Sequence, residues 1–178
     1  MSIPLNLSPM TELEAVNAML LSIGQAPVNT LEVPGIKDVS FARLMLHNTN
    51  RQVQSRGWWF NRELGYELIP ASNGEIVLPG TALEIVSSDP GRDLVERDRK
   101  LYDRDRHTFK FDGPVKVDVV WFLPFEDIPQ VARDFVAMRA ARIFQSQIVG
   151  SQILYQFTKE MELEAGALMT EVIRVPET

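Results

Sequence analysis

The 178-residue chain contains no cysteine, two histidines and no apolar run approaching the ~20 residues of a membrane-spanning helix. Without cysteine it has no disulfide, thiolate metal site or cysteine nucleophile, so we expect synthesis in a reducing cytoplasm. Its first residues lack a basic region followed by an apolar one, so we expect no signal peptide. Its formal net charge is -6, which argues against general binding of nucleic acid, because such binding usually requires a basic domain.

Motifs that carry catalysis are also missing from the sequence. It has no GxSxG, P-loop or GxGxxG pattern, and His47 and His107 lack the spaced companions of a metal site. Glu126 and Asp127 precede an expected helix, where acidic side chains more often cap the helix than perform acid–base chemistry. We therefore predict that the protein is not an enzyme, with no catalytic residue, no cofactor and no metal.

Apolar spacing predicts helices towards both ends of the chain. The expected helices cover residues 12–24, 39–56, 128–148 and 151–173. The first begins at a capping box that pairs Thr11 with Glu14, and Asp127 is expected to cap the third. The second helix carries a stripe of Ala42, Leu46, Thr49 and Val53. The last helix carries the longest stripe, which consists of Leu154, Phe157, Met161, Ala165, Leu168 and Val172.

Between residues 58 and 123 the hydrophobic period changes to two, which predicts strands. The clearest alternation is in VKVDVVWFL, where one face carries Val115, Val117, Val119, Trp121 and Leu123. A shorter alternation, ELGYEL, would place Leu64, Tyr66 and Leu68 on one face. The predicted fold is therefore α+β. It is a single domain, 1–178, in which N- and C-terminal helices form a bundle around a mostly antiparallel β-rich insertion, 58–123.

The run RDLVERDRKLYDRDRH, residues 92–107, alternates six basic with five acidic side chains. This balance does not suit a phosphate-binding patch. One interpretation is a solvated hairpin or loop. The other is an interface that meets a complementary charged surface on a neighbouring subunit. The candidate interface residues in this run are Arg97, Arg99, Arg104 and Arg106.

The stretch NRQVQSRGWWFN places two of the three tryptophans directly after an expected helix. Gly57 can end that helix in a left-handed cap. In a strand, Trp58 and Phe60 would share one face, and Trp59 would lie on the other. One face should meet the bundle and the other the sheet or a partner, so Trp58 and Trp59 are further candidate interface residues.

This stretch resembles the signature of the tail tubular A adaptors of short-tailed, podovirus-type bacteriophages. The similarity extends upstream through LEAVNAMLLSIGQAPVNTLE and downstream through LYDRDR and FEDIPQVARDFVAMRAARIF, in the same order. The resemblance implies a structural virion protein without a cofactor, made in the host bacterial cytoplasm. It would form a ring, expected to be a dodecamer, at the head–tail junction. The ring would connect the portal protein to the tail nozzle, a tail tubular B-like protein, and surround the DNA exit channel.

Two other classes of function remain open at the level of sequence. One is a virion-associated cell-wall glycan hydrolase that uses acidic side chains, and the other is a soluble binding module that uses the β insertion. For the adaptor, we expect DNA to pass through without specific binding. Arg139 and Arg142 stand one helical turn apart, so they could contact phosphates or pair with the acidic last helix.

Overall fold

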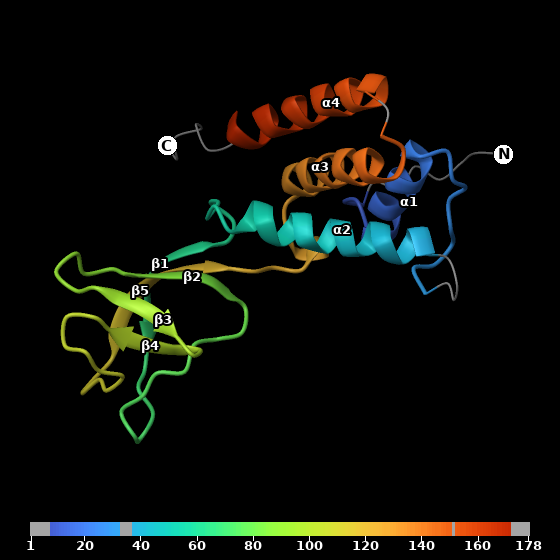
Figure 1. The fold of residues 1–178 in the computed structure, drawn as a ribbon. Coiled ribbons are helices and arrows are strands. Elements are labelled where there is room, and N and C mark those ends of the chain that lie inside the picture. Colours follow the sequence, from blue (N-terminus) through green and yellow to red (C-terminus); the bar gives the residue numbers. More distant parts are fainter. Residues whose placement is uncertain (1–7, 33–36, 151, 172–178) are drawn as a thin grey trace. The chain divides into compact units, whose positions relative to one another are not determined.

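The computed structural model describes residues 8–32, 37–150 and 152–171. Within them the chain forms α1 (Glu12–Ser22), α2 (Lys37–Gln54), β1 (Arg62–Leu68), β2 (Ala82–Ser87), β3 (Leu94–Arg97), β4 (Lys100–Asp103), β5 (Val115–Trp121), the 3-10 turn η1 (Phe125–Asp127), α3 (Gln130–Ile148) and α4 (Gln152–Glu171). The chain divides into two compact units. The helical unit combines the described residues up to Val53 with those from Pro124, and the β unit is Gln54–Leu123. The α+β class, with terminal helices flanking a β-rich middle, is confirmed (Figure 1).

Helix α3 lies at the centre of the helical unit, with α1 and α4 packed against it (Figure 1). Helix α2 also reaches it, because the ring of Phe41 lies 5.7 Å from that of Phe144. The small buried residues of α3 allow its neighbours to approach closely. These residues are Ala132, Ala137, Ala140 and Ala141.

The two N-terminal helices follow their sequence patterns. The capping box of α1 is confirmed, since the Glu14 N–H donates to Thr11 Oγ1 and the Thr11 N–H donates to the Glu14 carboxylate. The helix ends at Ser22, because Gly24 adopts a φ of +77° and turns the chain away. The predicted stripe of α2 is confirmed as buried.

The start of α3 differs from the prediction. Asp127 does not cap this helix; it belongs to η1, and α3 begins at Gln130 after Pro129. Ile128 is extended, as expected for a residue before proline. The Arg133 side chain reaches back from the first turn and donates to the carbonyl oxygens of Ile128, Glu126 and Met10.

Helix α4 is rotated relative to the predicted stripe. Ala165 is buried, but Met161 is 37% exposed and Leu168 is 58% exposed, so their assignment to the core is wrong. Met169 is fully buried instead, and Gly166 lies against the ring of Phe135. Small residues on this face permit close contact with α3, which the larger residues of the predicted stripe would prevent. The side chains of Leu154, Phe157 and Val172 lie outside the described residues.

The β unit contains two antiparallel sheets, a three-stranded sheet ordered β1-β5-β2 and the hairpin β3-β4. The alternating face of β5 is confirmed as the centre of the unit, because Val115, Val117 and Val119 belong to its buried core. The core is completed by side chains from strands β1, β3 and β4 and from two loops of the unit: Leu68, Ile76, Leu78, Leu94, Leu101 and Phe111.

Strand β1 departs from the simple alternation that its sequence suggests. The register against β5 shifts between Glu63 and Tyr66, which marks a bulge at this edge strand. Gly65 takes a φ of +68° within the bulge, and its N–H donates to the Asp118 carboxylate at 3.0 Å. Leu64 is consequently 72% exposed, although it was predicted to share a face with buried Leu68.

Across the described ranges, no helix combines the length and apolar character needed to cross a membrane.

Candidate interface surfaces

Two buried amide side chains join the two ends of the β unit. Asn61 Nδ2 donates to the carbonyl oxygens of Gln54 (3.0 Å) and Trp121 (2.7 Å), and Asn61 Oδ1 accepts from the Trp58 N–H (2.8 Å). The Gln54 amide exchanges two hydrogen bonds with the backbone of Leu123, at 2.8 and 2.9 Å. We call this set of five residues the amide clasp. It holds the first residues of the unit beside its last residues.

The amide clasp explains part of the stretch NRQVQSRGWWFN that sequence reasoning missed. Gln54 is fully buried and Asn61 is 2% exposed, yet both looked like ordinary surface residues in a polar run. A buried side-chain amide needs hydrogen-bond partners, and both of these amides find theirs in backbone groups. A usable signal was the placement of Gln and Asn on either side of a helix-ending glycine.

The tryptophan pair lies in a turn and not in a strand. The Asn61 N–H donates to the Trp58 carbonyl oxygen at 3.2 Å, and β1 begins after this turn, at Arg62. The expected opposite faces are therefore wrong, because strand alternation does not apply in a turn. Trp58 is buried, whereas Trp59 is 40% exposed and packs edge-on against Trp58 and Phe60.

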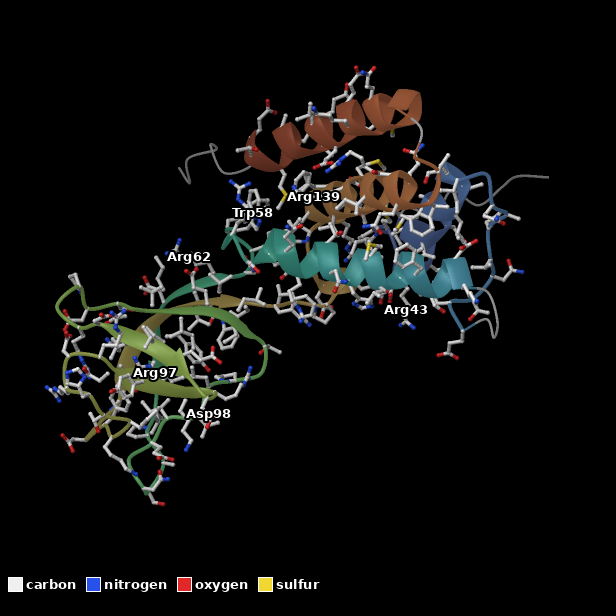
Figure 2. The ribbon with its side chains drawn as sticks, viewed as in Figure 1. Arg43, Trp58, Arg62, Arg97, Asp98 and Arg139 are labelled. Atoms are coloured by element: carbon white, nitrogen blue, oxygen red, sulfur yellow. The ribbon has the colours of Figure 1, made fainter. Side chains whose placement is uncertain are left out.

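The charged run 92–107 folds as the hairpin β3–β4 and the loop that follows it. The two-residue turn consists of Asp98 and Arg99, with φ values of 52° and 59°. Both residues are left-handed, as a type I′ hairpin turn requires, although Asn-Gly is the favoured pair at such turns. Arg97 and Asp98 stand at this tip (Figure 2). The Arg97 guanidinium carbon lies 4.0 Å from the centre of the Tyr102 ring.

Several charges of this run are paired within the β unit. Arg104 pairs with Asp93 at 3.2 Å, and Lys100 pairs with Glu75 at 3.0 Å. Arg99 donates weakly to the Leu78 carbonyl oxygen at 3.4 Å. These pairs fix the hairpin on its own unit. The four candidate arginines of the run are all exposed.

Asp103 anchors the loop after the hairpin. Its carboxylate is almost fully buried, and it accepts from the Arg92 guanidinium at 3.1 Å and from the Arg106 N–H at 2.9 Å. Burial would raise the pKa of Asp103, but the hydrogen bonds and the positive charges of Arg92 and Arg106 outweigh it and hold the pKa below its ordinary value. The charged carboxylate of Asp103 therefore has a structural role, which is to hold this loop in place.

A cleft of about 420 Å³ opens beside this loop. Its acidic lining residues are Asp89, Asp93 and Asp105. Asp89 accepts from the Gly91 N–H and Asp105 accepts from the Asp93 N–H, both at 2.9 Å, so these two carboxylates hold loop backbone. A glycosidase acid needs a raised pKa. Burial raises the pKa of Asp134, but Asp134 lies on α3, where Gln130 donates to it.

The remaining candidates from the sequence take part in contacts between helices. Arg139 and Arg142 both pair with Glu162 of α4, which is the pairing considered above as the alternative to phosphate contact. His47 lies 3.0 Å from the Glu12 carboxylate, on the surface of α2. Within the described part of the chain, no cluster of three or more potential ligands is placed to hold a metal ion.

Comparison with known proteins identifies relatives along nearly the whole chain. The family described as tail tubular protein matches residues 13–174. The curated protein "Tail tubular protein A" of Klebsiella phage KP34 is 29% identical over 166 residues, which cover 93% of this chain and 88% of that protein. The region matched by the family contains all of α1 except its first residue, all of α4, and residues of both units.

Proposed function

The chain belongs to the tail tubular protein family and is a structural component of a phage tail, and from this premise we propose that it forms the adaptor ring at the head–tail junction. The ring connects the portal protein to a tail nozzle built from a tail tubular B-like protein. It contains twelve copies and surrounds the DNA exit channel. The protein is made in the cytoplasm of the host bacterium.

The extent of the family match is the observation that carries this proposal. It runs from residue 13 to residue 174, so it includes the helical unit and the β unit together. A shared ancestry limited to one unit would support a shared fold for that unit alone. A match over both units favours a shared mechanical part in the tail.

The exposed residues of the β unit are proposed as one contact surface of the adaptor. The tip of hairpin β3–β4 carries Arg97 and Arg99, and its following loop carries Arg104 and Arg106. Trp59 offers exposed aromatic area on the same unit, next to buried Trp58. Aromatic and arginine side chains are enriched in protein interfaces, so this surface suits a neighbouring subunit or the nozzle.

Charge supports a passive role towards DNA. The net charge of -6 is repeated in every copy of a ring, which favours sliding of a polyanion over gripping. Arg139 and Arg142 both pair with Glu162, which offsets part of their positive charge. We expect binding of a labelled duplex to stay weaker than micromolar at low and at physiological salt. Tighter binding with a steep salt slope would contradict this part of the proposal.

The direct test is ordered assembly with purified portal rings. The protein should add up to twelve copies to a portal ring, as measured by mass photometry. The nozzle protein should then bind the portal–adaptor complex but not the portal alone. An unchanged portal mass at saturating protein, or release of fragments from purified cell-wall glycan by this chain, would overturn the adaptor assignment.

A further inference from the structure

Helix α2 presents a basic outward face. Its exposed side chains include Lys37, Arg43, Leu44, His47 and Arg51, which we call the basic α2 face. At 3.6 residues per turn these five positions fall within about 120° of the helix circumference. The helix contains a single acidic residue, Asp38. Leu44 is 53% exposed and provides apolar area among the charges.

Helix α4 presents an outward face of opposite sign. Glu160, Glu164 and Glu171 are exposed and fall within about 40° of one another around the helix. Met161 and Leu168 adjoin this row, and both are exposed apolar side chains. We call these five residues the acidic α4 face.

The two faces point away from the same central helix. Helix α3 lies between α4 and α2 within the helical unit (Figure 1). Arg139 lies between α3 and α4, where it pairs with Glu162, and Arg43 projects from α2 on the side away from α3 (Figure 2). Because Glu162 is turned towards α3, it is not one of the carboxylates that α4 presents outward.

We propose that the acidic α4 face of one copy binds the basic α2 face of the next copy. Each face combines exposed apolar side chains with a row of one charge, so a second copy of this chain presents a surface of opposite charge to each face. Arg43 and Arg51 are about 12 Å apart along α2, and Glu164 and Glu171 are about 10 Å apart along α4, so both charged positions can pair at once. Leu44 then packs against Leu168.

A contact between two different faces is heterologous, so it repeats head to tail and closes into a ring when the rotation permits. This inference rests on the proposed function only where it takes a closed ring, and not an open filament, as the assembly that forms. The pairing of the two faces does not depend on the portal or on the nozzle.

Glu12 already holds part of the basic face in position. Its carboxylate lies 2.8 Å from Arg43 Nε and 3.0 Å from His47 Nε2. Arg43 nevertheless remains 44% exposed, with donors available to a second carboxylate. Fixing a long side chain before binding reduces the entropy lost in the complex.

The absence of cysteine permits a direct test by cross-linking. We expect the variant with both Leu44→Cys and Leu168→Cys to give a ladder of disulfide-linked oligomers under mild oxidation at low salt. Each single-cysteine variant is the matched control and should stay monomeric on a denaturing gel, because position 44 meets position 168 and not itself. Dimers from a single-cysteine variant would show a symmetric contact and overturn the proposal, as would the absence of a ladder from the double variant.

Charge reversal provides a second test. Glu164→Arg with Glu171→Arg, or Arg43→Glu with Arg51→Glu, should each weaken self-association by at least ~10-fold in sedimentation velocity at low salt. The two variants mixed in equal amounts should recover association, because each then supplies the charges that the other needs. Glu63→Arg with Glu67→Arg alters the net charge as the α4 reversal does, but on exposed β1, and should leave association unchanged.

The outcomes separate this inference from the proposed function. A wild-type chain that stays monomeric at low salt, or a mixture that fails to recover, overturns the pairing of the faces even if the protein still adds to portal rings. Recovery of association in the mixture, together with failure to bind portal, upholds the pairing and overturns the adaptor assignment.

Discussion

At the scale of single residues, Asn61 and Gln54 have a larger structural role than their polarity suggests. Both side chains are buried, and their amides form hydrogen bonds with backbone groups of Trp58, Trp121 and Leu123. A buried polar group left without its partner costs about 1–3 kcal/mol. The amide clasp therefore makes the joining of the two ends of the β unit sensitive to one side chain.

We predict that Asn61→Leu lowers the free energy of unfolding by about 2–3 kcal/mol, because it removes three hydrogen bonds: those to the Trp58 N–H and to the carbonyl oxygens of Gln54 and Trp121. The measurement is urea unfolding followed by tryptophan fluorescence. Asn48→Leu, at an exposed position of α2, is the control and should change stability by less than ~0.5 kcal/mol. Equal effects of the two substitutions would show that the clasp contributes nothing.

The lowered pKa of Asp103 predicts that part of the protein's stability is lost in acid. Its pKa is lowered in the folded protein, so its contribution to stability is present above the unfolded pKa of about 4 and is lost as the pH falls through the lower folded value. We expect Asp103→Asn to be less stable than the wild type at pH 7, with a gap that narrows at and below about pH 4. Urea midpoints across this pH range provide the comparison. A gap that is constant with pH would exclude Asp103 as the source.

At the scale of elements, the contact between α3 and α4 depends on a glycine inside a helix. A Cβ added at Gly166 would lie 3.0 Å from Cε2 of the Phe135 ring. Glycine costs a helix about 1 kcal/mol relative to alanine, so its presence here is explained by the close approach of the two helices.

We predict that Gly166→Leu destabilises the protein by about 1–3 kcal/mol through overpacking against Phe135. Ala167→Leu adds a similar side chain at the next, exposed position and should change stability by less than ~0.5 kcal/mol. Thermal melts followed by circular dichroism at 222 nm report on both variants. Gly166→Leu with wild-type stability would mean that the two helices can separate without cost.

Hairpin β3–β4 gives a second prediction at this scale. Reversing Arg97 and Arg99 to Glu should leave the β unit folded but weaken assembly of the ring on the portal or binding of the nozzle protein to that ring. The defect should shrink as salt rises, because exposed charges are screened within ~10 Å at 0.1 M. Arg62→Glu with Lys116→Glu makes the same change in net charge elsewhere on the unit and should have no such effect. Full assembly of the hairpin variant at low salt would exclude this surface.

At the scale of the whole molecule, the helical unit is built from two segments that the β unit separates. Residues 8–53 and 124–171 can meet only when the ends of the intervening 54–123 segment lie close together, and the amide clasp holds those ends. Unfolding of the β unit therefore adds loop-closure entropy to the cost of keeping the helical unit folded. This dependence favours one cooperative domain.

We propose on this basis that residues 1–178 unfold as a single domain. Calorimetry should show one transition, with a calorimetric enthalpy equal to the van't Hoff enthalpy. Asn61→Leu should shift that whole transition to lower temperature without splitting it. Two resolved transitions in the wild type would show instead that the units unfold independently.

The sequence alone determined the class of fold and the family. The spacing of apolar residues changes from a period of 3.6 to a period of 2 and then back to 3.6. The first period places apolar residues on one face of a helix and the second on one face of a strand, so the pattern predicts terminal helices around strands. The Thr11–Glu14 capping box, the buried stripe of α2 and the core face of β5 are local patterns, and the structure confirms all three. The ordered motifs, such as NRQVQSRGWWFN and LYDRDR, identified the tail tubular family without any coordinates.

Tertiary structure alone decided which polar and apolar residues depart from those patterns. The buried face of α4 is set by how closely α3 can approach, so Gly166 and Met169 face inward while Leu168 stays exposed. Burial of Gln54 depends on the backbone of Leu123, which is 69 residues away in the sequence, and no local sequence pattern relates two residues at that separation. Periodicity records which residues can be buried, whereas the partner that covers them is fixed by long-range packing.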